Sequence, residues 1–582
     1  MVDASLENQT SSSSLSSSAA PTLWADKFLN DTANFANHPA MQALNAIMED
    51  EDDGTNDVLP SLPILPLYQT IHQGEFAPAL LGRFSAEQRT AFLDLDLWQK
   101  DNVDPDRFAF WPPLYAACPN ERIRFEFAAS PSFGLYLKAK FNIWTFDVED
   151  PQYPDHDNYF LTEDNLLLFE FAPDYPYVDQ IKQLIKDLYT NLGVEKAYAH
   201  LFKYVAESFI LLQEEEYQAK KSRLADFGFV DYYDALDFIA PLPSLSHLAA
   251  WVQKVAAPVD RAILDDHGAS LNPWAVATFK TRSSLWEKEL QKVTDPQAQE
   301  FLNFSLIRLI NALLVLPGHL PRSSLSAAPV ITQAKQCLEL GLSYVHAMRP
   351  HLEILNVFDF AQLYRVGNSL LRILAAQLKK DLTAAKFKSE EEYFLGPTWN
   401  RFIEDIDQDQ WNGHKISDFA TWNLAWEQEK VLAYHLPFAA KLKEALQKLI
   451  GDGSIATGAY YNYPLNEVDY EAILLSLLAN FMLEKQQDLA APKLGVSIAE
   501  FKTWMIKLAP SAPASLKLDP TLATNFLTSI GMQEVPQMRD YLNAILAEQL
   551  GGENYQTWPD ANFAHVGGPL IFAPANAQTV LQ

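Results

Sequence analysis

Apolar side chains recur at helical spacing through most of this 582-residue chain. The stretches 301–314 and 360–378 each carry an apolar residue at every third or fourth position, and residues 181–188 and 201–226 are amphipathic in the same way. A period of 3.6 residues places such side chains on one side of an α-helix. The pattern therefore predicts a mainly α protein with a multi-helical body. No fixed repeat period accompanies it, which argues against a regular solenoid.

The period changes between residues 139 and 171. Phe141, Ile143 and Thr145 alternate with the side chains between them, and a second aromatic-rich stretch runs from Tyr159 to Phe171. Alternation among aromatic and β-branched residues is typical of strands. We therefore predict one small β-hairpin or sheet near residues 139–171, as an insertion into the helical body.

These patterns divide the chain into six segments. Residues 1–58 are predicted to form a disordered, acidic N-terminal arm, because a serine tract and the acid run 49–53 flank a short helical pattern at 23–48. The remaining divisions are a helical N-terminal module at 59–138, the small β element at 139–175, the main helical body at 176–508, a C-terminal helical segment at 509–572 and a frayed tail at 573–582.

Short-range signals predict where some helices begin and end. Ser85 and Gln88 have the spacing of a capping box, in which each side chain bonds the backbone of the other residue. Gly228 can adopt the left-handed conformation that ends a helix, and Asp231 can cap the next one. Residues 223–239 are therefore predicted to form a helix–turn–helix joint with a structural role, since a helix that reads DNA would be basic.

Two features inside helices carry further predictions. Glu216 and Lys220 are four residues apart, which predicts an ion pair along one helix. Gly367 interrupts a long apolar stripe, although glycine costs roughly 1 kcal/mol against alanine inside a helix. A close contact with another helix explains such a glycine, and the wall of a pocket is the alternative.

The charge balance narrows the classes of partner. The chain has 44 Lys and Arg against 74 Asp and Glu, a formal net charge of −30. Affinity for nucleic acid depends on neutralising phosphates with Lys and Arg. We therefore expect no nucleic-acid partner.

The cysteines and apolar stretches bear on location. Two isolated cysteines, Cys118 and Cys337, exclude a disulfide framework and a cysteine-based zinc site. The start of the chain lacks the basic and apolar pattern of a secretory signal. Residues 306–316 and 472–483 are shorter than the ~20 apolar residues that cross a bilayer. We expect no transmembrane segment and a cytoplasmic location.

Four ordered segments carry a resemblance to a known family. They read FSAEQRTAFLDLDLW at 84–98, with Trp111 downstream; EEEY at 214–217, with RLADFGFVDYYDAL at 223–236; LYRVGNSL at 363–370; and YLNAILAEQL at 541–550, before DANF at 560–563. Together they resemble an uncharacterised bacterial family, domain of unknown function 6178. The resemblance implies one helical architecture over about residues 60–572, and it implies no activity and no catalytic residues. The first unit also resembles helical modules of magnesium-transporter regulatory domains and flagellar motor switch proteins, which is an analogy of fold alone.

Two acidic clusters are candidate sites. Asp405, Asp407 and Asp409 alternate, so they could converge on Mg²⁺ or Ca²⁺ from a loop. An EF-hand loop would place Gly and Glu where Gln410 and Ile416 stand, so that pattern fails and a solvated acidic loop is the plainer interpretation.

The second cluster accompanies two tryptophans. Asp94 and Asp96 point about 200° apart on a helix, so they would not share a ligand unless the helix ended there. Helix termination explains them; a binding edge with Trp98 and Trp111 is the alternative. The sequence contains no phosphate-binding glycine loop, nucleophile elbow or zinc-binding histidine pair, and no cofactor is predicted apart from the divalent cation named above.

Three hypotheses of function follow. The first is a non-enzymatic protein-interaction or regulatory protein with protein partners. The second is a metal-assisted enzyme that uses one of the two Asp clusters. The third is a peripheral regulator of a membrane complex, by analogy with the transporter and flagellar modules.

Overall fold

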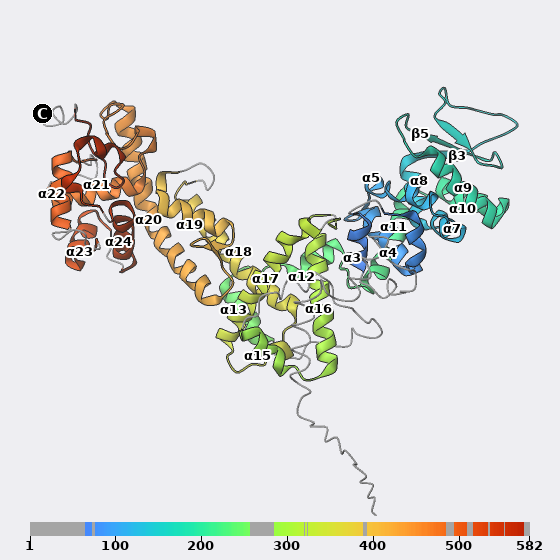
Figure 1. The fold of residues 1–582 in the computed structure, drawn as a ribbon, viewed down its shortest axis with the longest axis horizontal. Coiled ribbons are helices and arrows are strands. Elements are labelled where there is room, and N and C mark those ends of the chain that lie inside the picture. Colours follow the sequence, from blue (N-terminus) through green and yellow to red (C-terminus); the bar gives the residue numbers. More distant parts are fainter. Residues whose placement is uncertain are drawn as a thin grey trace, which may run out of the picture. The chain divides into compact units, whose positions relative to one another are not determined.

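The structure, a computed structural model, describes residues 64–72, 76–255, 284–318, 320–322, 324–387, 393–484, 494–508, 516–532, 536–551 and 553–574. The predicted arm at 1–58 lies outside the described residues, as does most of the predicted tail. The chain forms two compact units, Met1–Ser369 and Leu370–Gln582. Their boundary falls inside one helix, α18, Phe360–Ala384 (Figure 1).

Helices make up most of the described chain, which confirms the predicted fold class. In unit 1 they are α3 (Ile64–Ile71), α4 (Ala86–Leu97), α5 (Pro105–Phe108), α6 (Trp111–Ala116), α7 (Glu121–Ala128), α8 (Pro131–Lys140), α9 (Val178–Leu192), α10 (Val194–Ala206), α11 (Phe209–Ala225), α12 (Tyr232–Ile239), α13 (Leu245–Lys254), α15 (Ser284–Lys292), α16 (Pro296–Val315), α17 (Ser324–Met348) and the first part of α18.

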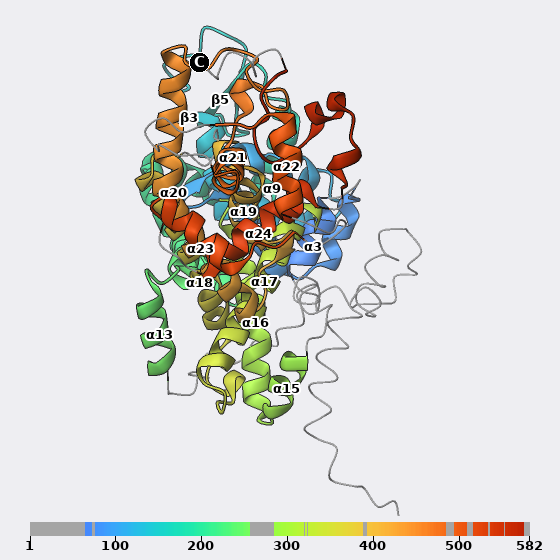
Figure 2. The ribbon, with the colours of Figure 1, turned by 90° about the vertical axis from the view of Figure 1, so that its left-hand side faces the viewer.

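In unit 2 the helices that follow α18 are α19 (Pro397–Asp407), α20 (Phe419–Gly451), α21 (Tyr470–Met482), α22 (Ile498–Leu508), α23 (Pro520–Ser529) and α24 (Pro536–Leu550). They are orange to red in Figures 1 and 2. Nearly every side chain of α21 is buried, from Tyr470 to Asn480. A helix that is apolar on all sides belongs in a core, and α21 contacts both α20 and α22.

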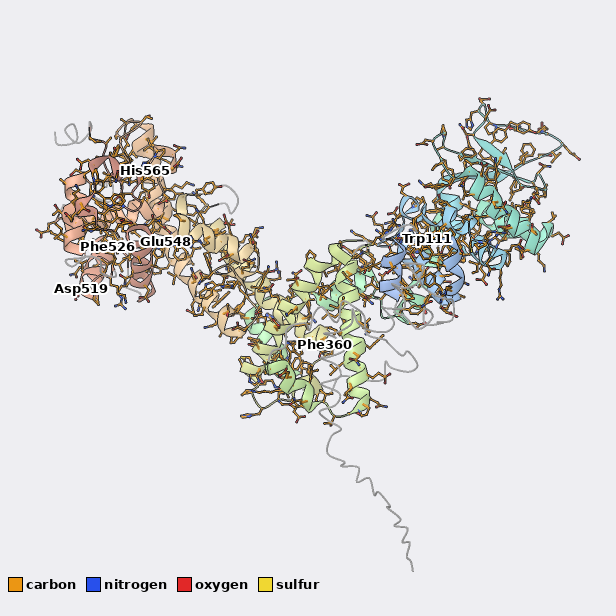
Figure 3. The ribbon with its side chains drawn as sticks, in the orientation of Figure 1. Trp111, Phe360, Asp519, Phe526, Glu548 and His565 are labelled. Carbon is orange, nitrogen blue, oxygen red and sulfur yellow. The ribbon has the colours of Figure 1, made fainter. Side chains whose placement is uncertain are left out.

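The first helices of unit 1 pack around an aromatic core. Trp111, labelled in Figure 3, lies against Phe92 of α4 with ring centroids 6.3 Å apart. Tyr115 stacks on Phe127 at 4.1 Å. All four side chains are almost fully buried, and large aromatic rings contribute much of the apolar area that holds such a core together.

The predicted β element is present as a three-stranded antiparallel sheet in the order β3–β5–β4. Its strands are β3 (Phe141–Thr145), β4 (Tyr159–Leu161) and β5 (Leu167–Phe171). The register pairs Phe141 with Phe171 and Phe160 with Phe169. Helices α8 and α10 contact β3.

Two further hairpins were not expected from the sequence. They are β1 (Trp98–Gln99) with β2 (Asn102–Val103), and β6 (Gln410–Trp411) with β7 (His414–Lys415). Strands of two residues are too short to show alternation, so the period gives no signal for them. Each hairpin lies directly after one of the acidic clusters singled out above.

The predicted capping box at Ser85 and the predicted helix–turn–helix joint at Gly228 are both confirmed. The backbone N of Gln88 donates to Ser85 Oγ at 3.1 Å, and the backbone N of Ser85 donates to Gln88 Oε1 at 3.0 Å. Gly228 has a φ of +75° after the end of α11, and Asp231 caps α12 by accepting from the backbone N of Tyr233. These caps fix the directions in which α4 and α12 leave their loops.

Gly367 is the site of a very close helix contact, as predicted. A Cβ atom on Gly367 would lie 1.9 Å from the carbonyl oxygen of Cys337 in α17. A Cβ on Gly341 would lie 2.0 Å from the carbonyl oxygen of Leu363 in α18. Only glycine leaves room for two backbones at this distance.

One helix among the described residues, α16, is long and apolar enough to cross a membrane. The buried share of its apolar window is 72%. Its buried face includes Phe301, Leu306, Ile310 and Leu313, and it packs against α12 and α17. By its contacts α16 is a core helix of unit 1, and it is longer than the apolar stretch 306–316 that the sequence suggested.

Candidate functional site

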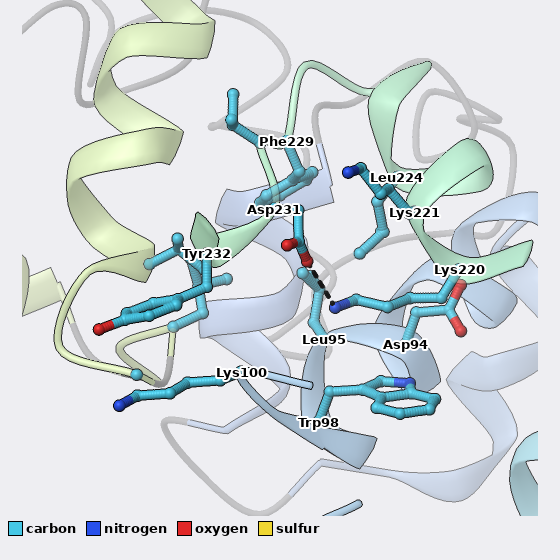
Figure 4. A pocket seen from close by; sticks show the side chains of 14 residues that line it. Asp94, Leu95, Trp98, Lys100, Lys220, Lys221, Leu224, Phe229, Asp231 and Tyr232 are labelled. Carbon is cyan, nitrogen blue, oxygen red and sulfur yellow. Dashed lines mark hydrogen bonds and ion pairs between the residues drawn. The ribbon is translucent and has the colours of Figure 1, made fainter. Parts of the chain in front are cut away.

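A recess in unit 1 lies where α4, the β1–β2 turn, α11 and the start of α12 meet (Figure 4). Fourteen residues line it, and its empty volume is about 540 Å³, counted out to the solvent at its mouth. Three lysines belong to the lining: Lys100, Lys220 and Lys221. The lining also includes two carboxylates, Asp94 and Asp231, which pair with Arg223 and Lys220.

Asp94 lies at the edge of this recess, and both oxygens of its carboxylate bind one arginine. Its two carboxylate oxygens accept from Arg223 of α11, at 2.9 Å from Nε and 2.8 Å from Nη2. Arg223 also donates to Glu216 at 2.5 Å. Burial raises the pKa of Asp94, and Arg223 opposes that rise. A bidentate pair of this kind is both strong and directional.

Lys220 lies on the inner wall, with 8% of its surface exposed. Its Nζ is 5.5 Å from the ring centroid of Trp98, 4.8 Å from that of Tyr217, and 3.4 Å from Asp231 Oδ1. Tyr217 donates its hydroxyl to the other oxygen of Asp231 at 2.6 Å. Burial lowers the pKa of Lys220, and the charge of Asp231 opposes that change. The aromatic faces and the carboxylate compensate the buried ammonium.

These contacts correct one sequence-based prediction. Glu216 was expected to pair with Lys220 along α11, but the structure pairs Glu216 with Arg223 and Lys220 with Asp231. The reason is tertiary: α4 brings the buried carboxylate of Asp94 to Arg223, and Glu216 joins that cluster. An ion pair between neighbours on one helix contributes little, and the bidentate contact between Arg223 and Asp94 of another helix is stronger.

The mouth of the recess is built on a tight turn. Lys100, between β1 and β2, has a φ of +59°, a left-handed conformation that is uncommon for a residue with a side chain. Its exposed amine lies 4.8 Å from the ring centroid of Tyr232 (Figure 4). Tyr233 donates its hydroxyl to Asp101 of the same turn at 3.3 Å, so the turn and α12 hold each other in place.

Asp96 faces away from the recess and forms a separate hub. Its carboxylate accepts from Tyr68 at 2.6 Å, Trp111 Nε1 at 2.8 Å and Arg107 Nε at 2.8 Å. Arg322 lies 2.8 Å away through Nη2. Burial opposes ionisation of this carboxylate, but the surrounding donors and positive charges hold the pKa of Asp96 well below its usual range. Asp94 and Asp96 therefore have different partners, as their positions on one helix predict.

The cluster of Asp405, Asp407 and Asp409 lies at the end of α19 and directly before the β6–β7 hairpin. Asp405 Oδ2 accepts from the backbone N of Gly413 at 3.1 Å. Both oxygens of Asp409 accept from Arg372 at 2.6 Å. Burial raises the pKa of Asp409, and Arg372 opposes that rise. Within the described ranges, no three His, Cys, Asp or Glu side chains are placed to hold a metal ion.

Of the four predicted edge residues, the structure places Asp94 and Trp98 in the recess and Asp96 and Trp111 in the hub behind it. Lys100 and Tyr232 were missed as site residues. An exposed lysine and a tyrosine have no local signal that marks them, and their contact spans 132 positions of the chain.

The chain was compared with models of known protein families. A family model matches residues 28–558, which is most of the chain. The chain belongs to the Family of unknown function (DUF6178). This membership confirms the resemblance noted in the sequence, and both recess-forming segments, 84–98 and 214–236, lie inside the matched range. No curated protein and no solved structure matches the chain.

Proposed function

We propose that this protein is a non-enzymatic binding protein, and that the recess in unit 1 receives an acidic side chain from a protein partner. The observation that carries the proposal is the lysine-lined recess beside exposed apolar side chains of α12. The carboxylates of Asp94, Asp231 and Asp96 all accept hydrogen bonds from arginine, lysine, tyrosine or tryptophan side chains. A group tied in this way is not free to act as a base or a metal ligand.

The rim has the character of a protein-binding surface. Tyr233 and Leu236, three residues apart on α12, are 50% and 42% exposed. Trp98 and Tyr232 form aromatic walls just inside. Binding energy at protein interfaces concentrates in aromatic side chains next to a pocket that excludes water. The rim and recess together would bury an apolar anchor and, beside it, one carboxylate.

Charge defines the partner further. Lys100 and Lys221 contribute amines at the lining, and Lys221 already pairs with Asp234 at 2.7 Å. Lys100 is therefore the lysine we assign to the incoming carboxylate. The net charge of −30 repels a strongly acidic protein. The partner we propose is a neutral or basic protein that presents an apolar segment with a single acidic side chain.

The proposal includes a cytoplasmic location. Cys118 and Cys337 are both buried, and two isolated buried cysteines support a compartment that keeps thiols reduced.

The test compares variants of the full chain in capture experiments. A double variant, Tyr233→Ser with Leu236→Ser, removes the apolar rim, and Ile506→Ser is the matched control, because Ile506 is 54% exposed but lies in unit 2. A captured protein should be lost with the rim variant and retained with the control. It is then purified and titrated calorimetrically against Lys100→Met, which should weaken binding roughly tenfold, or ~1.4 kcal/mol. Capture of the same proteins by wild type and rim variant would count against the proposal.

A further inference from the structure

The mouth of the recess in unit 1 combines one cation with an apolar rim. Of the three lining lysines, Lys220 pairs with Asp231 and Lys221 with Asp234, whereas Lys100 has no ion pair with any described residue. The rim consists of exposed apolar side chains of α12. A segment that fits both features has apolar side chains directly followed by a carboxylate.

The chain itself contains such a segment. Ile47 and Met48 are followed by an unbroken run of five acidic residues at 49–53. The segment lies in the predicted N-terminal arm, ahead of the described part of unit 1. The match to the family begins at residue 28, so residues 47–53 belong to the sequence that the family shares, and the serine tract before them does not.

The arm is attached close to the recess. The described chain begins with α3, where the hydroxyl of Tyr68 accepts from Arg107 Nη2. The same nitrogen donates to the carbonyl oxygen of Leu320, which belongs to the recess lining. One arginine side chain therefore connects α3 with the recess wall. Glu49 precedes the first residue of α3 by 15 positions, and an extended chain of that length spans roughly 50 Å. The acid run can reach the mouth.

This attachment compensates for the repulsion between acidic parts of one chain. A separate, strongly acidic protein is repelled by the net charge of −30. A segment on a short connection instead has an effective concentration on the order of 1 mM at its site. A weak contact is then enough to occupy the recess. Only one carboxylate of the run has to meet Lys100, and solvent screens the others.

We propose that residues 47–53 of this chain occupy the recess while no partner is bound. Ile47 and Met48 lie against the α12 rim, and one carboxylate of the acid run binds Lys100. This inference rests on the proposed function, because it adds a regulation of the same recess. A protein partner has to displace the segment, and its apparent affinity falls by the fraction of molecules in which the recess is occupied.

The first test needs no partner. A carbodiimide joins a lysine amine to a carboxylate in contact with it, and mass spectrometry locates the link in the full chain, which is kept dilute to avoid links between molecules. We expect a link from Lys100 to residues 49–53 that weakens at high salt. Lys100→Arg keeps the charge but removes the reactive amine, so this link should be lost. Absence of the link in the wild type would overturn the inference.

Two pairs of variants test the apolar contact. Ile47→Ser with Met48→Ser should reduce the Lys100 link severalfold. Leu23→Ser with Trp24→Ser is the matched control, because it changes two adjacent apolar residues of the same arm that precede the family match. The control should leave the link intact. Thermal melts check that both variants remain folded. Equal links in the two variants would contradict the assigned contact.

The second test uses the partner captured in the rim experiment described above. The Ile47→Ser, Met48→Ser variant should bind it about tenfold more tightly than the wild type, because a competitor at millimolar effective concentration has been weakened. The control variant should bind as the wild type does. Unchanged affinity in both variants would overturn the inference.

The failures of the two proposals are distinguishable. Capture of a partner at the rim without the Lys100 link contradicts the arm contact and leaves the proposed function standing. A Lys100 link in a chain that captures no partner supports the arm contact and contradicts the proposed function.

Discussion

Replacing Asp96 by Asn tests whether one carboxylate holds the first part of unit 1 together. The change keeps the volume of the side chain but removes its charge and turns one acceptor into a donor. Tyr68, Arg107 and Trp111 all donate to this carboxylate, and Arg322 reaches it from the segment before α17.

The expected loss follows from burial. The side chain of Asp96 is 0% exposed, against 14% for Arg107 and 33% for Arg322. Removing one partner of a buried ion pair costs about 3–5 kcal/mol. Arg107 keeps other acceptors, at Tyr68 and the carbonyl of Leu320, and Arg322 is partly solvated. We therefore expect the lower end, ~3 kcal/mol, which is a more than hundredfold change in the unfolding equilibrium.

The assay is urea unfolding of the full chain followed by tryptophan fluorescence, since Trp111 itself donates to Asp96. The control is Asp106→Asn, because Asp106 is 86% exposed and pairs with Lys140 at the surface. Its midpoint should stay close to that of the wild type, as is usual for exposed ion pairs. An Asp96→Asn midpoint equal to that of the control would refute the view that Asp96 is a structural hub.

Three further outcomes are expected. First, burial and the neighbouring Asp381 raise the pKa of Glu429 to about 8. Between pH 4.5 and about 8 the folded state therefore binds one proton more than the unfolded state, so stability falls as the pH rises. Glu429→Gln should flatten this dependence of the melting temperature on pH. Gly367→Ala should destabilise the chain by at least ~2 kcal/mol through its backbone clash, whereas Gly451→Ala, with open space around it, should stabilise it by about 0.5 kcal/mol. Millimolar Ca²⁺ should leave the melting temperature unchanged, because Arg372 occupies Asp409.

Features encoded by neighbouring residues could be predicted from the sequence. The capping box at Ser85, the helix joint at Gly228 and the sheet at 141–171 each depend on residues a few positions apart or on a clear change of period. The close contact at Gly367 was predictable because glycine inside an apolar helix needs a reason.

The site depends instead on distant pairings. Arg223 lies 129 residues after Asp94, and Arg322 lies 226 residues after Asp96. The residues around an arginine on a helix do not indicate which distant carboxylate it will bind. The region of the recess could therefore be predicted through Asp94 and Trp98. Lys220 and Lys221 join them only because α11 packs on α4, a contact between distant segments that the sequence does not reveal.

The paired glycines of α17 and α18 limit how this part of the protein can change. Each of Gly341 and Gly367 faces a main-chain carbonyl of the opposite helix. A larger residue on one helix therefore cannot be accommodated by a smaller one on the other, because a carbonyl group is common to every amino acid. No compensating second substitution exists, and the spacing between the two helices can be adjusted only by displacing a whole helix.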